Sequence, residues 1–122
     1  MLRLMWHGTS GTDPSVIALG ENGLDSRFAK AGAHGYGTYF ANNAAYSMTS
    51  YKYTKPDGTL QLLLCLVIVG NTVVLGGDGN RKQPPNRPDG KPYDSVSSSA
   101  DGNHVIVYDL NKQFPCYLVS FK

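Results

Sequence analysis

The longest uninterrupted apolar run of this chain extends from Leu62 to Val69, inside a segment rich in Leu, Val and Ile that begins at Leu60. A run of this length is far short of the roughly 20 residues that a membrane-spanning helix requires. Its β-branched residues, and the Gly70 that ends it, favour a strand over a helix. Continuous apolarity is typical of a strand covered on both faces. We therefore expect residues 60–69 to form a central, fully buried strand.

The rest of the chain shows almost no long helical periodicity. Its 122 residues include 14 glycines and 8 tyrosines, with short apolar runs between the glycines. Glycine favours turns, whereas short β-branched and aromatic runs favour strands. We expect strands at Leu2–Trp6, Val105–Tyr108 and Tyr117–Phe121, and an extended piece at Thr72–Leu75. Pro115 falls in the turn between the last two strands or at a sheet edge.

Two short helices are expected. The first covers residues 15–21, because Thr12 or Asp13 can cap it and Pro14 suits its first turn. The second covers residues 44–51 and follows two consecutive asparagines, either of which can cap it. The tight apolar segment Thr38–Ala41 precedes this second helix.

Two stretches are expected to be irregular. Residues 28–37 contain three glycines, and residues 76–101 hold four of the seven prolines with many Gly, Ser and Asn residues. The second stretch is long enough to be a functional loop or lid. Strands outnumber helices and the two do not alternate regularly. This favours one α+β domain over a doubly wound α/β sheet.

Composition narrows the classes of function. Eleven Lys and Arg against nine Asp and Glu give a net charge of +2, too weak to indicate a nucleic-acid or membrane-surface partner by itself. Hydrophobic residues make up 41% of the chain, which excludes global disorder. Cys65 and Cys116 do not make a disulfide scaffold. We therefore expect an intracellular protein, in the cytoplasm or the nucleus.

The segment Trp6-His7-Gly8-Thr9-Ser10 ends the first strand with an imidazole, a glycine and two hydroxyls. The glycine allows a ligand to approach the backbone and to use its N–H and C=O groups. For so short a motif, the more frequent interpretation is a histidine at the edge of the core beside a glycine turn.

The segment Gly35–Ala41 (GYGTYFA), followed by Ser47, carries a sharper signal. Two glycines precede the aromatic pair Tyr39 and Phe40, and a helix bearing a hydroxyl follows. Flat aromatic faces with a few polar groups suit a planar heteroaromatic ligand, although both rings could equally belong to the core. The spacing is not Gly-x-Gly-x-x-Gly and the segment opens no βαβ unit, which excludes the dinucleotide fingerprint.

The remaining polar residues form no recognisable metal-binding, Ser-His-Asp, phosphate-loop or paired-carboxylate signature. The three histidines lie far apart in the sequence. We therefore expect no metal. Asn103 and His104 directly precede an apolar strand, so a polar side chain at that strand start could face a cleft.

Taken together, these segments resemble the catalytic domain of the PARP-like (diphtheria-toxin-type) ADP-ribosyltransferases. The matching segments run in the family's order over nearly the whole chain: WHGT at 6–9, GLDSRFA at 23–29, GYGTYFA at 35–41, AAYS at 44–47, LLCLV at 63–67, PP at 84–85, YDSV at 93–96, VIVYD at 105–109 and FPCYLV at 114–119. The YDSV segment and the FPxYL ending are most similar to the mono-ADP-ribosylating branch.

The resemblance implies an α+β ADP-ribosyltransferase fold, with split, largely antiparallel sheets and two short helices around an NAD cleft. Residues 1–122 are expected to form a single catalytic domain whose start is shorter than is usual in the family.

The resemblance also implies NAD+ as the co-substrate and assigns residues to it. His7 matches the first member of a His-Tyr-Glu triad, which bonds a ribose hydroxyl and the carboxamide region. Gly8 matches the backbone clamp on the nicotinamide amide. Tyr39 matches the second triad member, which lies against the nicotinamide ring, and Ser47 matches a hydroxyl that also holds the carboxamide.

Further NAD-binding positions follow from the same resemblance. The family carries a second stacking tyrosine at variable spacing, for which Tyr51 is our choice and Tyr53 the alternative. Arg27 falls one residue from an arginine that approaches the pyrophosphate. The NAD-binding set is completed by Thr9, Phe40 and Ala41.

The third triad position departs from the family. Counting back from FPCY at 114–117, and separately from VIVYD at 105–109, places His104 where polymerising members have Glu. A neutral imidazole can bond a ribose hydroxyl or act as a base, but it does not supply the charge of a carboxylate. We therefore expect transfer of a single ADP-ribose unit to a protein side chain or nucleic acid, with His7, Tyr39 and His104 as the catalytic residues.

Three other interpretations stay open. The first is a catalytically inactive module that binds NAD or ADP-ribose, and the second is an NAD glycohydrolase whose acceptor is water. The third is an RNA phosphotransferase of the same fold superfamily, whose further histidine and paired arginines have no match here. We expect a monomer with no membrane partner.

Overall fold

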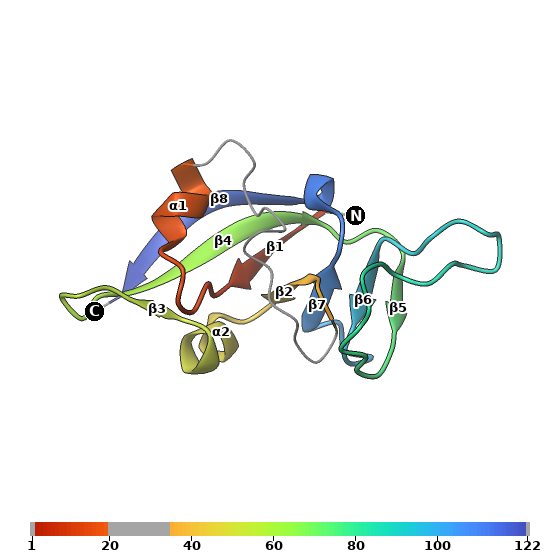
Figure 1. Ribbon diagram of the computed structural model, residues 1–122, viewed down its shortest axis with the longest axis horizontal. Helices are drawn as coiled ribbons and strands as arrows, with labels where there is room; N and C mark the ends of the chain where they lie inside the picture. The colour runs from red at the N-terminus through yellow and green to blue at the C-terminus, as the bar shows by residue number, and fades with distance from the viewer. Residues whose placement is uncertain (1, 20–34, 122) are drawn as a thin grey trace.

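The computed structural model of the chain describes residues 2–19 and 35–121. Its elements, in chain order, are β1 (Leu2–His7), α1 (Pro14–Leu19), β2 (Thr38–Ala41), α2 (Ala44–Ser50), β3 (Tyr53–Thr54), β4 (Leu60–Ile68), β5 (Thr72–Val74), β6 (Ser95–Ser97), β7 (His104–Val107), the 3-10 turn η2 (Leu110–Lys112) and β8 (Gln113–Phe121). The expectation of a strand-rich α+β domain with two short helices is confirmed (Figure 1). Neither helix is long enough to cross a membrane in the part of the chain described.

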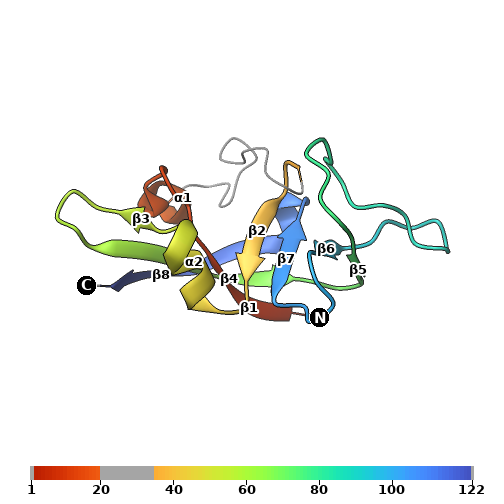
Figure 2. The ribbon, with the colours of Figure 1, turned by 90° about the horizontal axis from the view of Figure 1, so that it is seen from below.

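The described strands form one sheet in the order β3-β4-β1-β2-β7-β6-β5, with β8 paired to the other side of β4. Every pair is antiparallel except β5 with β6. β1 and β2 share a single register pair, Trp6 with Ala41. Beyond that pair the sheet turns, so that β2 and β7 run across the direction of β4 and β8 (Figure 2). The sheet therefore has two halves that meet at one residue pair. The first half contains β3, β4, β1 and β8, and the second half contains β2, β7, β6 and β5.

The core lies on the face of the first half that α1 covers. Met5, Leu63, Cys65 and Val67 are buried on this face of β1 and β4, and Ile17 of α1 packs on them. Asp13 caps α1, because its Oδ1 accepts a hydrogen bond from the Ser15 backbone N–H at 2.9 Å. Residues 20 and 21, where the sequence predicted this helix to end, lie outside the described residues.

The second helix begins where the sequence predicted. Asn43 caps it, since its Oδ1 accepts a hydrogen bond from the Ala45 N–H at 2.7 Å. The helix ends at Ser50, and the Tyr51 N–H bonds the Ser47 carbonyl as the cap. This cap fixes the direction in which the chain leaves the helix.

The apolar run forms β4 and has neighbouring strands on both sides, as expected. The prediction that both of its faces are buried was wrong. Leu63, Cys65 and Val67 are buried, whereas Leu64, Leu66 and Ile68 are only half-buried. Continuous apolarity in the sequence does not reveal which face another layer covers.

The prediction of one irregular stretch from 76 to 101 was wrong at residues 95–97, which form the buried strand β6. Serine-rich sequence is typical of loops, but these hydroxyls are bonded to backbone. Ser95 Oγ donates to the Val69 carbonyl at 2.8 Å, and Ser97 Oγ donates to the His104 carbonyl at 2.9 Å. A buried hydroxyl with such a partner carries little desolvation cost.

Pro115 lies inside β8, which begins at Gln113 rather than at Tyr117 as predicted. Of the two positions considered for this proline, the sheet edge is the one observed, because β8 pairs only with β4 among the described strands. A proline is tolerated there, since an edge strand has one side that needs no ladder hydrogen bond.

Candidate active site

The imidazole of His7 lies at the end of β1 and connects it to β2. Its Nδ1 lies 2.8 Å from the Tyr39 backbone carbonyl oxygen. A carbonyl only accepts hydrogen bonds, so Nδ1 carries the proton and Nε2 is left as an acceptor in the neutral ring. Burial lowers the pKa of His7, against the opposing effect of the Tyr39 carbonyl. The neutral, Nδ1-protonated form is therefore favoured at neutral pH.

The turn after His7 is held against the end of α2. A Cβ on Gly8 would lie 2.2 Å from the Tyr51 carbonyl oxygen and 2.5 Å from the Tyr51 Cβ. The same carbonyl accepts a hydrogen bond from the Ser10 N–H at 2.9 Å. Glycine is therefore required at position 8. Of the two stacking candidates, Tyr51 adjoins the His-Gly turn, whereas Tyr53 lies in β3 opposite Gln61.

The two aromatic residues of β2 point to opposite faces of the strand. The Phe40 ring lies 5.5 Å from the His7 ring and is buried. The Tyr39 hydroxyl donates to the Gly35 carbonyl at 3.3 Å. Phe40 is therefore part of the core beneath His7, and Tyr39 is half-buried on the other face.

His104 begins β7 directly opposite Ala41 of β2. Residues opposite each other share a face, and so do residues two apart along a strand. Tyr39, Ala41 and His104 therefore lie on the same face of the second half. Trp6, which precedes His7, is the partner of Ala41 on its other side.

The other predicted site residues differ in how they are placed. Ser47 is buried in α2, which packs against β1 and β2. The Thr9 hydroxyl is used locally, since it donates to the Thr12 carbonyl. Arg27 lies outside the described residues. The structure thus brings His7, Gly8 and Tyr51 together at the end of β1. It places Tyr39, Ala41 and His104 on the adjoining strands β2 and β7, on the face opposite Phe40. The contact of His7 with the Tyr39 backbone carbonyl links the two groups.

A set of residues beside Tyr39 was not predicted from the sequence. The Tyr36 N–H bonds the Arg81 carbonyl at 2.9 Å, and a Cβ on Gly37 would lie 3.0 Å from the Tyr108 ring. Burial raises the pKa of Tyr108. A hydrogen bond with the Arg81 side chain opposes this rise, and the electrostatic effect of the nearby Tyr39 adds to it. Because Arg81 and Tyr108 are remote in sequence, the only available signal was the paired glycines around Tyr36.

Comparison with known proteins gives a consistent result. Residues 2–87 match the poly(ADP-ribose) polymerase catalytic domain family. A probable poly(ADP-ribose) polymerase of Dictyostelium discoideum is 31% identical over 122 residues, which cover 97% of this chain and 33% of that protein. Protein mono-ADP-ribosyltransferase PARP14 of Homo sapiens is 32% identical over 125 residues, covering 97% of this chain and 7% of that protein. The chain thus spans a third or less of the length of these relatives.

A solved structure shares the fold. The PARP domain of Arabidopsis RADICAL-INDUCED CELL DEATH1 superposes with a TM-score of 0.79 at 24% identity, covering 99% of this chain and 67% of that one. The expected ADP-ribosyltransferase fold is confirmed, with the two halves of the sheet joined at Trp6 and Ala41. On the family match over residues 2–87, the chain belongs to the poly(ADP-ribose) polymerase catalytic domain family.

Proposed function

We propose that this chain binds NAD+ and transfers a single ADP-ribose unit to an acceptor, with release of nicotinamide. Family membership supports ADP-ribosyl transfer as the class of reaction. The observation that carries the proposal is the 2.8 Å contact from His7 Nδ1 to the Tyr39 carbonyl, which joins the two motif segments at the junction of the sheet halves.

The residues at this junction fit the nicotinamide end of NAD+. His7 presents Nε2 as an acceptor for a ribose hydroxyl. Gly8 offers backbone N–H and C=O groups to a carboxamide without a side chain in the way, and Ser47 adds a hydroxyl. Tyr39 and Tyr51 offer aromatic faces for a planar ring.

The proposed step breaks the bond between the ribose C1′ and the nicotinamide nitrogen. The bonding pair leaves with nicotinamide, which becomes neutral, and C1′ acquires the positive character of an oxocarbenium-like state. An acceptor oxygen then supplies a pair to C1′ and loses its proton to a base. The chain's contribution is to hold the ring, the ribose and the acceptor in line, which lowers the entropic part of the barrier.

His104 is the basis for proposing single transfer rather than chain growth. A carboxylate at this position can accept from a ribose hydroxyl and also favour nearby positive charge. A neutral imidazole retains the hydrogen bond without the charge. His104 accordingly has the role of orienting the ribose or accepting a proton.

The same substitution favours a second candidate function, binding of NAD+ or ADP-ribose without transfer. Hydrolysis, with water as the acceptor, is the remaining outcome. Mass spectrometry of the chain after incubation with NAD+ separates these functions. A single added ADP-ribose on the chain or a test acceptor supports transfer. Free ADP-ribose alone indicates hydrolysis, and unchanged NAD+ with a thermal shift indicates binding only. A ladder of added units contradicts the proposal of single transfer.

The location of the site is tested separately by thermal denaturation with benzamide, which mimics the nicotinamide amide. A ligand that binds only the folded chain raises the melting temperature by mass action. Tyr39→Ala is expected to abolish the shift, and Tyr93→Ala, on the segment before β6, is expected to keep it. A full shift in Tyr39→Ala would place the pocket elsewhere.

His104 is tested by two further variants. His104→Ala is expected to reduce transfer less than Tyr39→Ala does, because ring stacking and the amide clamp survive. His104→Glu is expected to retain the benzamide shift. Loss of that shift in His104→Glu would contradict the role given to His104, since the charge then acts on binding rather than on transfer.

A further inference from the structure

The segment that leads into β2, residues 35–37, lies against the backbone of Arg81. Gly35 is buried and has a φ of 83°, a conformation that residues with side chains rarely adopt. A Cβ on Gly35 would overlap the Arg81 carbonyl group. That carbonyl also accepts a hydrogen bond from the Tyr36 N–H at 2.9 Å. The chain that follows β5 is therefore held beside the start of β2 (Figure 2).

The other side of this segment faces Tyr108, which directly follows β7. The two strands pair Tyr39 with Ile106, and residues two apart along a strand share a face. A Cβ on Gly37, which is buried, would lie 3.0 Å from the Tyr108 ring. The Tyr108 ring therefore lies on the same face as Tyr39, next to Ile106 and on the side away from His104.

Arg81 connects the two sides of the segment through its side chain. This side chain donates a hydrogen bond to the Tyr108 hydroxyl, since an arginine side chain carries only donors. Its Nη2 also donates to the Gly76 carbonyl at 3.2 Å. On the other side, the Tyr39 hydroxyl donates to the Gly35 carbonyl at 3.3 Å. A series of contacts therefore leads from Tyr108 through Arg81 and Gly35 to the Tyr39 ring.

We propose that Arg81 and Tyr108 are positioning residues for Tyr39, which fix the orientation of its ring on the face that carries the proposed site. Their effect on ligand binding rests on the proposed function, whereas the contacts themselves do not. A segment with two glycines has many backbone conformations available. A ring that binds a planar ligand must be held in a narrow range of orientations. Contacts on both sides of residues 35–37 supply that restriction.

Calorimetric titration with benzamide tests the effect on binding. Tyr108→Phe keeps the ring against Gly37 and removes the hydroxyl that accepts from Arg81, and Arg81→Met removes the donor. Each variant is expected to raise the benzamide dissociation constant about three- to tenfold, the effect of one lost hydrogen bond. The double variant is expected to raise it no further than Arg81→Met does, because both changes remove the same bond.

Lys82→Met is the matched control, because it removes one positive charge from the residue next to Arg81. The Lys82 Nζ lies 5.7 Å from the centre of the exposed Tyr36 ring, outside the series of contacts that leads to Tyr39. This variant is expected to bind benzamide like the parent. Far-UV circular dichroism establishes that each variant folds.

NMR of the tyrosine rings separates this proposal from the proposed function. In the ligand-free chain with ¹³C-labelled tyrosines, Tyr108→Phe and Arg81→Met are each expected to shift or broaden the Tyr39 signals, and Lys82→Met is expected to leave them unchanged. Tyr39→Phe identifies these signals by their loss. A parent chain that does not bind benzamide would contradict the proposed function, and the NMR comparison would still test the positioning of Tyr39.

Two results would overturn the positioning role. The first is a set of Tyr39 signals, or a benzamide affinity, that stays at the parent value in both Tyr108→Phe and Arg81→Met. The second is an equal change in Lys82→Met, which would assign the effect to the charge of the loop rather than to the contacts of Arg81.

Discussion

The backbone of Gly8 lies so close to the backbone of Tyr51 that a methyl group on Gly8 would sit 2.2 Å from the Tyr51 carbonyl oxygen. Because that carbonyl also accepts the Ser10 N–H, the His-Gly turn and the end of α2 form one unit. The nicotinamide clamp that we propose at Gly8 therefore depends on the position of this helix.

Gly8→Ala is expected to destabilise the chain by about 1–3 kcal/mol, the usual cost of overpacking a close contact. The end of α2 must move to admit the methyl group, so the thermal shift with benzamide should also be lost. Gly11→Ala is the matched control, since a Cβ there meets nothing within 4 Å. Urea denaturation of both variants measures the difference. Equal stability of the two would contradict the close approach.

His7 should make the stability of the chain depend on pH. Burial lowers the pKa of His7 in the folded state, whereas the pKa of a histidine in the unfolded chain is about 6.5. The unfolded state therefore takes up the proton first, and the free energy of unfolding falls as the pH drops below about 6.5. We expect this decline to shrink in His7→Gln and to persist in His104→Gln. Denaturation at pH 7.5 and 5.5 provides the comparison.

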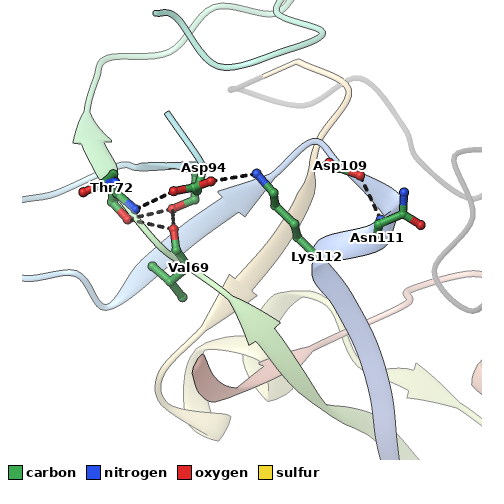
Figure 3. Close-up of polar contacts among 8 residues, drawn as sticks. Val69, Thr72, Asp94, Asp109, Asn111 and Lys112 are labelled. Atoms are coloured by element: carbon green, nitrogen blue, oxygen red, sulfur yellow. Dashed lines mark hydrogen bonds and ion pairs between the residues drawn. The ribbon is translucent and has the colours of Figure 1, made fainter. Parts of the chain in front are cut away.

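The carboxylate of Asp94, which lies just before β6, connects its own segment to Asn71 between β4 and β5 and to Lys112 in η2 (Figure 3). It accepts from Lys112 Nζ at 2.8 Å and from the Asn71 N–H at 2.8 Å. These bonds hold the pKa of Asp94 below its usual range. Its contribution is therefore present above about pH 3.9, the unfolded value, and lost as the pH falls through the folded value.

Lys112→Met is expected to cost up to about 1 kcal/mol at pH 7, because the pair is partly exposed. The cost should shrink as the pH falls below about 3.9, because the carboxyl of the unfolded chain then takes up a proton before the folded one does. Lys91→Met, on an exposed residue, should remain within about 0.5 kcal/mol of the parent. An NMR titration of the Asp94 carboxyl provides a direct check, and an unchanged pKa in Lys112→Met would contradict the assignment.

The two cysteines should react very differently. Burial raises the pKa of Cys65 to about 12, and Cys116 is exposed. Since the thiolate is the nucleophile, iodoacetamide at pH 8 should label one thiol in the folded chain and two in guanidinium. Cys116→Ser should leave the folded chain unlabelled. Rapid labelling of that variant would show that the β4 core opens readily.

The strands and helices with strong local signals were predictable from sequence. The apolar run of β4 and the asparagine before α2 both act through near neighbours in the chain. β6 was not predictable, because its serines become strand residues only through bonds to Val69 and His104. The start of β8 was missed for a related reason, since Pro115 is acceptable only at an edge with a bulge beside it.

The candidate site was predictable as a set of motifs but not as an arrangement. A resemblance places His7, Tyr39 and His104 in order along the chain, yet the contact of His7 with the Tyr39 carbonyl depends on a single register pair. Arg81 and Tyr108 could not be found, because their association with the Gly35–Gly37 segment is made entirely in three dimensions.

The pairing of β4 with both β1 and β8 also constrains how the molecule folds. β4 pairs with β1 on one side and with β8 on the other, so this half of the sheet needs residues 2–7 and residues 113–121 before its ladder is complete. Such long loop closures carry an entropic cost before any contact compensates for it, and topologies of this kind fold slowly. Until residues 113–121 have left the ribosome, β4 would therefore have no partner strand on one side.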